Sequence, residues 1–112
     1  MKPGDLYWVE FPGGAGRAQA GRRPAIVVQG ASASAKLPTV LLVPLTTQLD
    51  ALRFPGTFLV ESDSQNGLRL PSVALVFQMT AIDKRFLAHN FGRLSETDLQ
   101  TVWSVFGEIT AQ

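Results

Sequence analysis

The 112-residue sequence contains no cysteine and a single histidine, His89. Without cysteine there is no disulfide framework and no thiol chemistry. One histidine also leaves a zinc site short of its usual ligands, so we expect neither a metal nor another cofactor. A catalytic triad would have to recruit His89, which alternates with Leu87 and Phe91 as an ordinary strand residue does.

Long hydrophobic runs are also missing. No apolar segment approaches the roughly 18 residues that cross a bilayer, and Asp5 and Glu10 interrupt the N-terminal stretch that a signal peptide would need. No glycine-rich phosphate-binding motif is present. An apolar content of 46% over this length predicts one globular domain, residues 1–112, in a soluble cytoplasmic protein.

Acidic residues are absent between Glu10 and Asp50. Four basic residues fall in that interval: Arg17, Arg22, Arg23 and Lys36. A basic segment inside an otherwise balanced chain indicates an anionic partner. Solvated loop charges would give the same pattern.

Most of the chain has the alternation or the short apolar runs of β-strands. The strands are predicted at residues 5–11, 24–29, 39–47, 56–61, 72–80 and 87–94. Pro44 predicts an edge or a bulge in the third strand, and the segment 72–80 is predicted to be central. We expect a polar loop at residues 30–38 and turns at 62–67 and 81–86.

The period changes after Ser95, which is followed three residues later by Asp98 in a near capping box. An apolar stripe at helical spacing then runs to about residue 111 through Leu99, Val102, Trp103 and Phe106. The fold class predicted is mostly β, a small antiparallel barrel closed by a C-terminal amphipathic helix.

Two groups of polar residues at strand ends could bind an anion. Arg23 lies where a glycine-rich loop enters a strand, and Thr46, Thr47 and Gln48 lie where the next strand ends. A guanidinium matches phosphate oxygens in a bidentate manner, and a hydroxyl could complete the site. The threonines are equally compatible with simple strand filling, and Arg22 with a solvated cation. Spacing alone does not bring these groups together.

Five segments in order give the chain a resemblance to a known family: GDLYWVEF, GRRPAIVVQ, VPLTTQ, GLRLPSVALVFQMTAIDKRFL and FGRLSETDLQTV. Over residues 4–105 the sequence resembles the MazF/PemK family of toxin ribonucleases from bacterial toxin–antitoxin pairs. The resemblance implies an SH3-like barrel with a C-terminal helix, assembled as a homodimer. It also implies a metal-independent endoribonuclease that cuts single-stranded RNA, mostly mRNA, at short preferred sequences.

The resemblance also assigns roles to residues. Arg23, directly before the proline, and Thr46, two residues after the strand proline, correspond to the family's catalytic pair. The first loop of the family lies over the RNA. The predicted RNA contacts are Arg17, Gln19, Arg22, Thr47, Gln48 and Gln78. A cognate antitoxin with an acidic, disordered tail would occupy the same basic groove.

The chain departs from the family pattern at two positions. Phe77 occupies the place where some relatives carry an acid before the glutamine of the long strand, and Ala18 replaces an acid of the first loop. These departures keep open a degenerate member that binds RNA or antitoxin without cutting. A CcdB-like toxin, which shares the barrel and binds gyrase, is the other alternative, although its binding site lies at the end of a helix that is unremarkable here.

Overall fold

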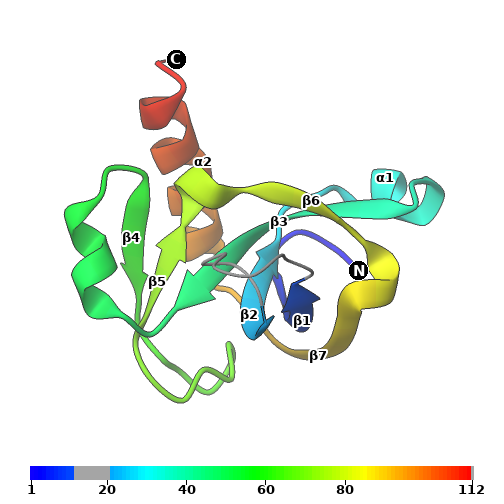
Figure 1. The fold of residues 1–112 in the computed structure, drawn as a ribbon, viewed down its shortest axis with the longest axis horizontal. Coiled ribbons are helices and arrows are strands. Elements are labelled where there is room, and N and C mark those ends of the chain that lie inside the picture. Colours follow the sequence, from blue (N-terminus) through cyan, green and yellow to red (C-terminus); the bar gives the residue numbers. More distant parts are fainter. Residues whose placement is uncertain (12–20, 112) are drawn as a thin grey trace.

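Seven strands form an antiparallel sheet in the computed structural model, which describes residues 1–11 and 21–111 (Figure 1). They are β1 (Asp5–Phe11), β2 (Gly21–Val27), β3 (Thr39–Thr46), β4 (Thr57–Val60), β5 (Ser72–Leu75), β6 (Thr80–Asp83) and β7 (Leu87–Arg93). The order in the sheet is β4-β5-β3-β2-β1-β7, and β6 pairs with the first half of β3. The predicted mostly β fold with a terminal helix is confirmed.

Two α-helices and three short 3₁₀-helices connect or follow the strands in the described part of the chain. They are α1 (Ala31–Lys36), α2 (Glu96–Ile109), η1 (Leu49–Arg53), η2 (Val76–Gln78) and η3 (Lys84–Phe86). None of these helices is long and apolar enough to cross a membrane.

The C-terminal helix begins where the sequence predicts. Ser95 caps it, and its hydroxyl accepts a hydrogen bond from the N–H of Asp98 at 3.1 Å. The buried residues of α2 are Leu99, Val102 and Val105. Trp103, predicted to belong to the buried stripe, is instead 43% exposed. The buried face of the helix includes Val105 and leaves Trp103 at its margin.

The sheet curves strongly, but the strand ladder does not close between β4 and β7 among the described residues, so a barrel describes it loosely. The connection between β4 and β5 lies across this opening. The N–H of Arg93 in β7 donates to the Gln65 carbonyl at 3.0 Å, and Asn66 is fully buried. A Cβ placed on Gly92 would lie 2.1 Å from the Asn66 carbonyl oxygen. The backbones therefore touch here.

The loop predicted at residues 30–38 is wrong, because Ala31–Lys36 form α1. Alanine favours the helical backbone, and it alternates with serine over this segment. Ser34 is buried, and the side-chain amide of Gln29 donates to its hydroxyl at 3.2 Å. The polar side chain of Ser34 thus has a hydrogen-bond partner inside the protein.

The strand predicted at residues 72–80 is also wrong, because η2 divides it into β5 and the start of β6. Both strands pair with the same neighbour: β6 with Thr39–Leu42 and β5 with Leu45 and Thr46. The central strand is therefore β3, which contacts β2, β5 and β6. Residues 81–83, predicted as part of a turn, belong to β6, and only η3 turns the chain.

Pro44 was predicted to mark an edge or a bulge, and the edge is wrong, because Pro44 lies inside the sheet. It pairs with Ala25 of β2. On the other side of β3, the β6 pairing ends at Leu42 and the β5 pairing begins at Leu45. The proline, which has no N–H, stands in the gap between the two partners.

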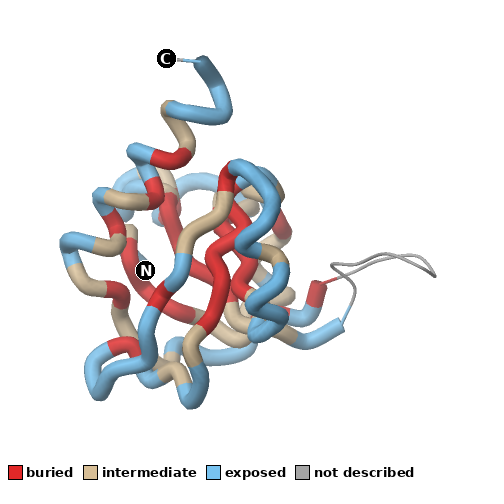
Figure 2. Tube along the Cα trace, turned by 90° about the vertical axis from the view of Figure 1, so that its left-hand side faces the viewer, coloured by how far each residue is buried: buried red, intermediate tan, exposed pale blue. Residues whose placement is uncertain are grey.

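The core fills both sides of the sheet, and buried positions recur along the strands and on one side of α2 (Figure 2). Beneath α2, Leu6, Ile26 and Leu45 belong to one buried cluster with Val102. A second cluster on the far side includes Val9, Val27, Leu42 and Ile82. One buried charge links β1 to β7: Arg93 donates to the Asp5 carboxylate at 3.0 Å.

Candidate active site

Arg23 and Thr46 lie on the neighbouring strands β2 and β3. The antiparallel ladder pairs Ala25 with Pro44. Continued by two residues, toward the start of β2 and the end of β3, the same register places position 23 opposite position 46. Cross-strand partners lie on one face of a sheet. The sequence predicted a strand at residues 24–29, with both arginines before it. This start is wrong, because β2 begins at Gly21 and contains both.

A pocket of about 340 Å³ opens beside this pair of residues. Arg23, Thr46, Gln48 and Gln78, which the sequence analysis named, all line it. Their elements are β2, β3 and the two 3₁₀-helical segments η1 and η2 with their caps. Four of the eight predicted site residues therefore meet in one place.

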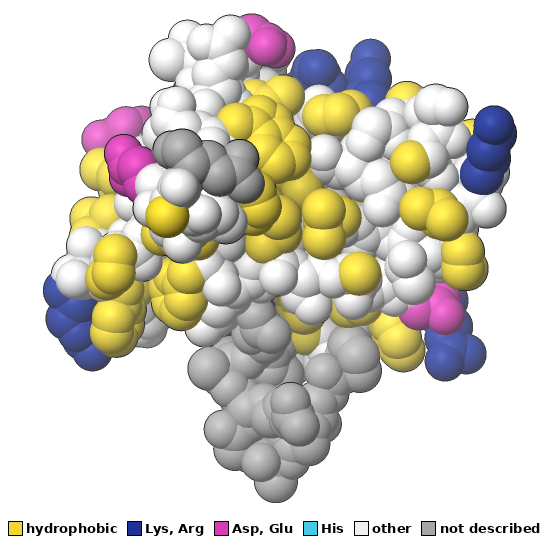
Figure 3. Space-filling view, turned by 90° about the horizontal axis from the view of Figure 1, so that it is seen from above, with side chains coloured by type: hydrophobic (Ala, Val, Ile, Leu, Met, Phe, Trp, Pro, Cys, Tyr) yellow, Lys and Arg dark blue, Asp and Glu magenta, His cyan; other side chains and the backbone are white. Residues whose placement is uncertain are grey.

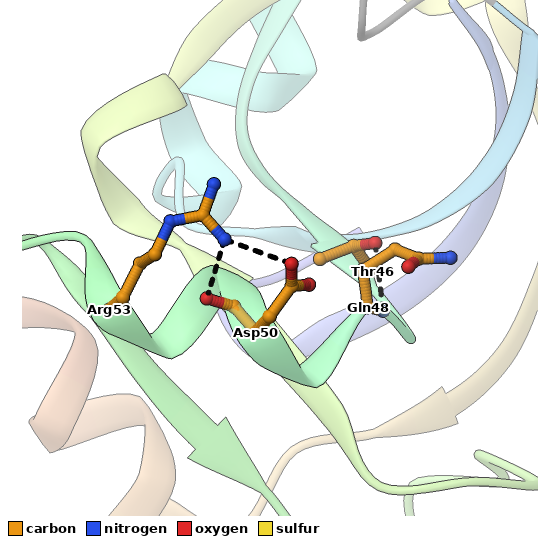
Figure 4. A network of polar contacts seen from close by, with 4 residues as sticks. All are labelled: Thr46, Gln48, Asp50 and Arg53. Carbon is orange, nitrogen blue, oxygen red and sulfur yellow. Dashed lines mark hydrogen bonds and ion pairs between the residues drawn. The ribbon is translucent and has the colours of Figure 1, made fainter.

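The Thr46 hydroxyl is held by the backbone that follows it. The N–H of Gln48 donates to Thr46 Oγ1 at 3.2 Å (Figure 4). This bond occupies a lone pair of the hydroxyl, whose own hydrogen can be donated to a ligand. Thr46 is thus oriented as a donor at the pocket wall.

The two arginines have different surroundings. Arg22 lies 3.6 Å from the Glu10 carboxylate in an exposed ion pair, and its guanidinium stands over the Trp8 ring at 5.5 Å. It does not line the pocket. Within residues 1–11 and 21–111, Arg23 makes no ion pair. Its charge is therefore directed at the pocket without a carboxylate partner from that part of the chain.

Thr47 lines a second, more apolar pocket of about 380 Å³. The ring centroids of Trp8 and Phe91 lie 5.5 Å apart there, and Pro24 forms part of the same wall. Successive residues of a strand point to opposite faces. Arg23 and Thr46 line one pocket, while Pro24 and Thr47, the residues that follow them, line the other.

The predicted contacts Arg17 and Gln19 lie outside the described residues. Phe77, where some relatives of the resembled family carry an acid, lines the first pocket and is 43% exposed. Position 77 therefore carries no carboxylate. His89 is exposed on β7 and lines neither pocket.

Five residues that line the pocket were missed by the sequence analysis: Asp50, Ala51, Arg53, Phe54 and Leu75. Asp50 and Arg53 belong to η1, where Arg53 Nη1 contacts the Asp50 carboxylate at 2.9 Å. Figure 4 shows the carboxylate directed between Arg53 and Thr46. The opposite charges three residues apart were a usable signal, because such spacing brings side chains together on one turn of helix.

The titration of one side chain on the adjoining strand is altered. Burial, and secondarily the negative charge of Asp5, raises the pKa of Tyr7 above its usual value of 10.0. The hydroxyl of Tyr7 is therefore kept neutral to a higher pH than in water.

Within residues 1–11 and 21–111, no three His, Asp or Glu side chains gather closely enough to hold a metal ion.

The comparison with protein families decides the assignment. Residues 2–110 match the model of the PemK-like, MazF-like toxins of type II toxin–antitoxin systems. This chain belongs to that family. Among characterised relatives, it is 29% identical over 103 residues to endoribonuclease EndoA of Bacillus subtilis, covering 91% of this chain and 87% of the relative.

Solved structures of PemK-like, MazF-like toxins have the same fold. MazF of Deinococcus radiodurans superposes with a TM-score of 0.80 at 26% identity, covering 100% of this chain and 97% of that one. The MazE–MazF structure from the same organism gives a TM-score of 0.77 at 26% identity, over 100% and 96% of the two chains. The open, curved sheet with its C-terminal helix is thus the family architecture.

Proposed function

We propose that this protein is an endoribonuclease toxin that cleaves single-stranded RNA, chiefly mRNA, at short preferred sequences without a metal ion. The family membership and the similarity to EndoA support this proposal. The observation that carries it is the pocket in which the Arg23 guanidinium and the Thr46 hydroxyl meet. These groups suit the stabilisation of a phosphate in reaction.

The chemistry requires no external nucleophile. The 2′-hydroxyl of RNA loses its proton to water as it attacks the adjacent phosphorus, the bond to the 5′-oxygen breaks, and that oxygen gains a proton, so that the protons balance. In the proposed mechanism, Arg23 stabilises the negative charge of the phosphorane, and its cationic donors face the leaving oxygen. Arginine is a poor general base, because its pKa lies above about 12. The Thr46 hydroxyl donates to a non-bridging oxygen.

The proposal extends to the RNA around the scissile phosphate. Gln48 and Gln78 line the same pocket and would contact the nucleotides there. Thr47 in the second pocket would contact a flanking nucleotide. Arg22, Arg17 and Gln19 would bind the RNA strand beyond the pockets. DNA lacks the attacking hydroxyl, so it would not be cut.

We also propose that a cognate antitoxin neutralises the toxin by laying an acidic, disordered tail along the RNA-binding groove. The toxin MazF of Deinococcus radiodurans, 26% identical, has been solved together with MazE. An acidic chain would compete with RNA for the same cations and order as it binds. Antitoxin binding should consequently weaken in high salt, as RNA binding does.

The proposed assembly is a homodimer of single-domain chains, residues 1–112, acting in the cytoplasm. Hydrophobic side chains gather beside the C-terminal end of α2 in the view from above (Figure 3). Trp103, Ile109 and the neighbouring Leu59 of β4 are each at least 38% exposed. Sedimentation of Trp103→Glu beside the unmodified chain tests this face, and equal masses would count against it.

The deciding experiment is an RNA cleavage assay with purified protein and a chelator. Unmodified protein should cut a mixed single-stranded RNA and leave a 2′,3′-cyclic phosphate upstream and a 5′-hydroxyl downstream. Arg23→Ala and Thr46→Ala should each abolish most of this cleavage while melting at unchanged temperatures. A folded, antitoxin-free protein that cuts none of many sequences would instead be a binder, and the departure at Phe77 would then matter.

A further inference from the structure

One wall of the active-site pocket consists of a charged pair that stability does not explain. Arg53 Nη1 lies 2.9 Å from Asp50 Oδ2 and 3.4 Å from the Asp50 carbonyl oxygen. The two side chains are 63% and 72% exposed. An exposed ion pair at this spacing contributes little to folding. Both side chains nonetheless line the pocket that Arg23 and Thr46 also line. Figure 4 shows the pair beside Thr46.

Two aromatic rings stand beside this pair. Phe54 and Phe77 are 44% and 43% exposed, and their ring centroids lie 5.9 Å apart. The Arg53 guanidinium stands over the Phe54 ring at 4.6 Å. Exposed rings at the wall of a polar pocket are surfaces on which a nucleobase can stack. The pocket volume of about 340 Å³ is within the range of small-ligand sites.

The carboxylate determines which base the wall can read. A carboxylate only accepts hydrogen bonds, and its two oxygens suit two parallel donors. Guanine offers N1–H and N2–H side by side on its Watson–Crick edge, the edge that proteins read in single-stranded RNA. Adenine, cytosine and uracil each place an acceptor next to a donor. The ion pair with Arg53 occupies one lone pair of the carboxylate and holds it in place.

We propose that Asp50, held by Arg53 and flanked by Phe54 and Phe77, is a guanine-recognition subsite. The base belongs to the nucleotide adjoining the phosphate that Arg23 and Thr46 would bind, because all six side chains line one pocket. Phe77 then supplies a stacking surface where some relatives carry an acid. This inference rests on the proposed ribonuclease function and adds its sequence preference.

The test compares the cut sites of unmodified protein, Asp50→Asn and Glu61→Gln on a random single-stranded RNA pool. Unmodified protein should favour guanine about tenfold or more at one position beside the cut. Asp50→Asn presents one donor and one acceptor, so the preference should fall about tenfold and move toward adenine. Glu61→Gln, an exposed change outside the pocket, should cut as the unmodified protein does. Because the Asp50 side chain is exposed, the variant should keep its melting temperature.

Equilibrium binding separates this inference from the proposed function. Short 2′-O-methyl RNAs that differ in one central base bind without being cut, and guanine should bind tightest and lose its advantage in Asp50→Asn. Cleavage with unchanged base frequencies in Asp50→Asn, or a preference for another base, would overturn the subsite while leaving the ribonuclease intact. Absence of cleavage with a guanine preference that depends on Asp50 would overturn the ribonuclease and leave the subsite.

Discussion

Arg23 of β2 lies level with Thr46 of β3, because the antiparallel register that pairs Ala25 with Pro44 brings these two positions together two residues further on. The two side chains line one pocket. A single phosphate can therefore contact both. The register of one strand pair, rather than a flexible loop, fixes the spacing of the proposed catalytic groups.

The first prediction concerns the coupling of these two residues. Arg23→Ala and Thr46→Ala should each lower the single-turnover cleavage rate by about 10²–10³. The double variant should lose less than the product of the two effects, because groups that act on one transition state are not additive. Rates on a single defined RNA check this. Fully multiplied losses would mean that the residues act on separate steps.

Arg22 should contribute to RNA affinity through charge alone. Replacing it with glutamine should weaken binding of 2′-O-methyl RNA and reduce the slope of log affinity against log salt by about 0.7. Arg85→Gln is a matched control, because Arg85 also pairs with an acid, Asp83 at 3.7 Å, and stands over an aromatic ring. It lines neither pocket. Equal slopes in the two variants would show that Arg22 has no special role.

Gly92 should tolerate no side chain. Its Cβ would lie 2.1 Å from the backbone of Asn66, so Gly92→Ala should destabilise the fold by about 1–3 kcal/mol or more. Gly107 in α2 has no atom within 4 Å of the same built position, and Gly107→Ala should stabilise by about 0.5–1 kcal/mol. Urea unfolding of both variants measures these changes. A neutral Gly92→Ala would mean that the loop can move off β7.

Stability should fall in alkali through Tyr7. Burial, followed by the charge of Asp5, raises the pKa of Tyr7 in the folded protein, so the folded state holds this proton more tightly than the unfolded state does. The contribution is constant below the usual pKa of about 10 and is lost as pH rises through the folded value. Unfolding free energies between about pH 9 and pH 11 should therefore fall more steeply for the unmodified protein than for Tyr7→Phe. Parallel curves would exclude this cause.

The sequence predicted the elements whose signals are local. The alternation at residues 5–11 corresponds to β1, and the Ser95 cap begins α2. The segment 72–80 misled because the apolar run of β5 continues into η2, and η2 carries no glycine or proline. Alternation alone cannot reveal a strand that bends and continues along the same neighbour.

The candidate site was partly predictable for a similar reason. The family resemblance named Arg23 and Thr46, and the structure brings both into one pocket with Gln48 and Gln78. Asp50 and Arg53 were missed because the segment after Gln48 was treated as a connection rather than as η1. A short 3₁₀ turn has too few residues to show a period, so only the charge spacing could have revealed it.

The alternation of the β2–β3 ladder makes the two pockets back-to-back neighbours separated by one layer of backbone. Arg23 and Thr46 face one pocket, and Pro24 and Thr47 face the other. A one-residue slip of β2 that moves Pro24 into the position of Arg23 would turn the guanidinium to the other face, away from Thr46. A single-residue insertion in β2 should thus erase the site as completely as deleting Arg23, while every residue of the site is still present in the chain.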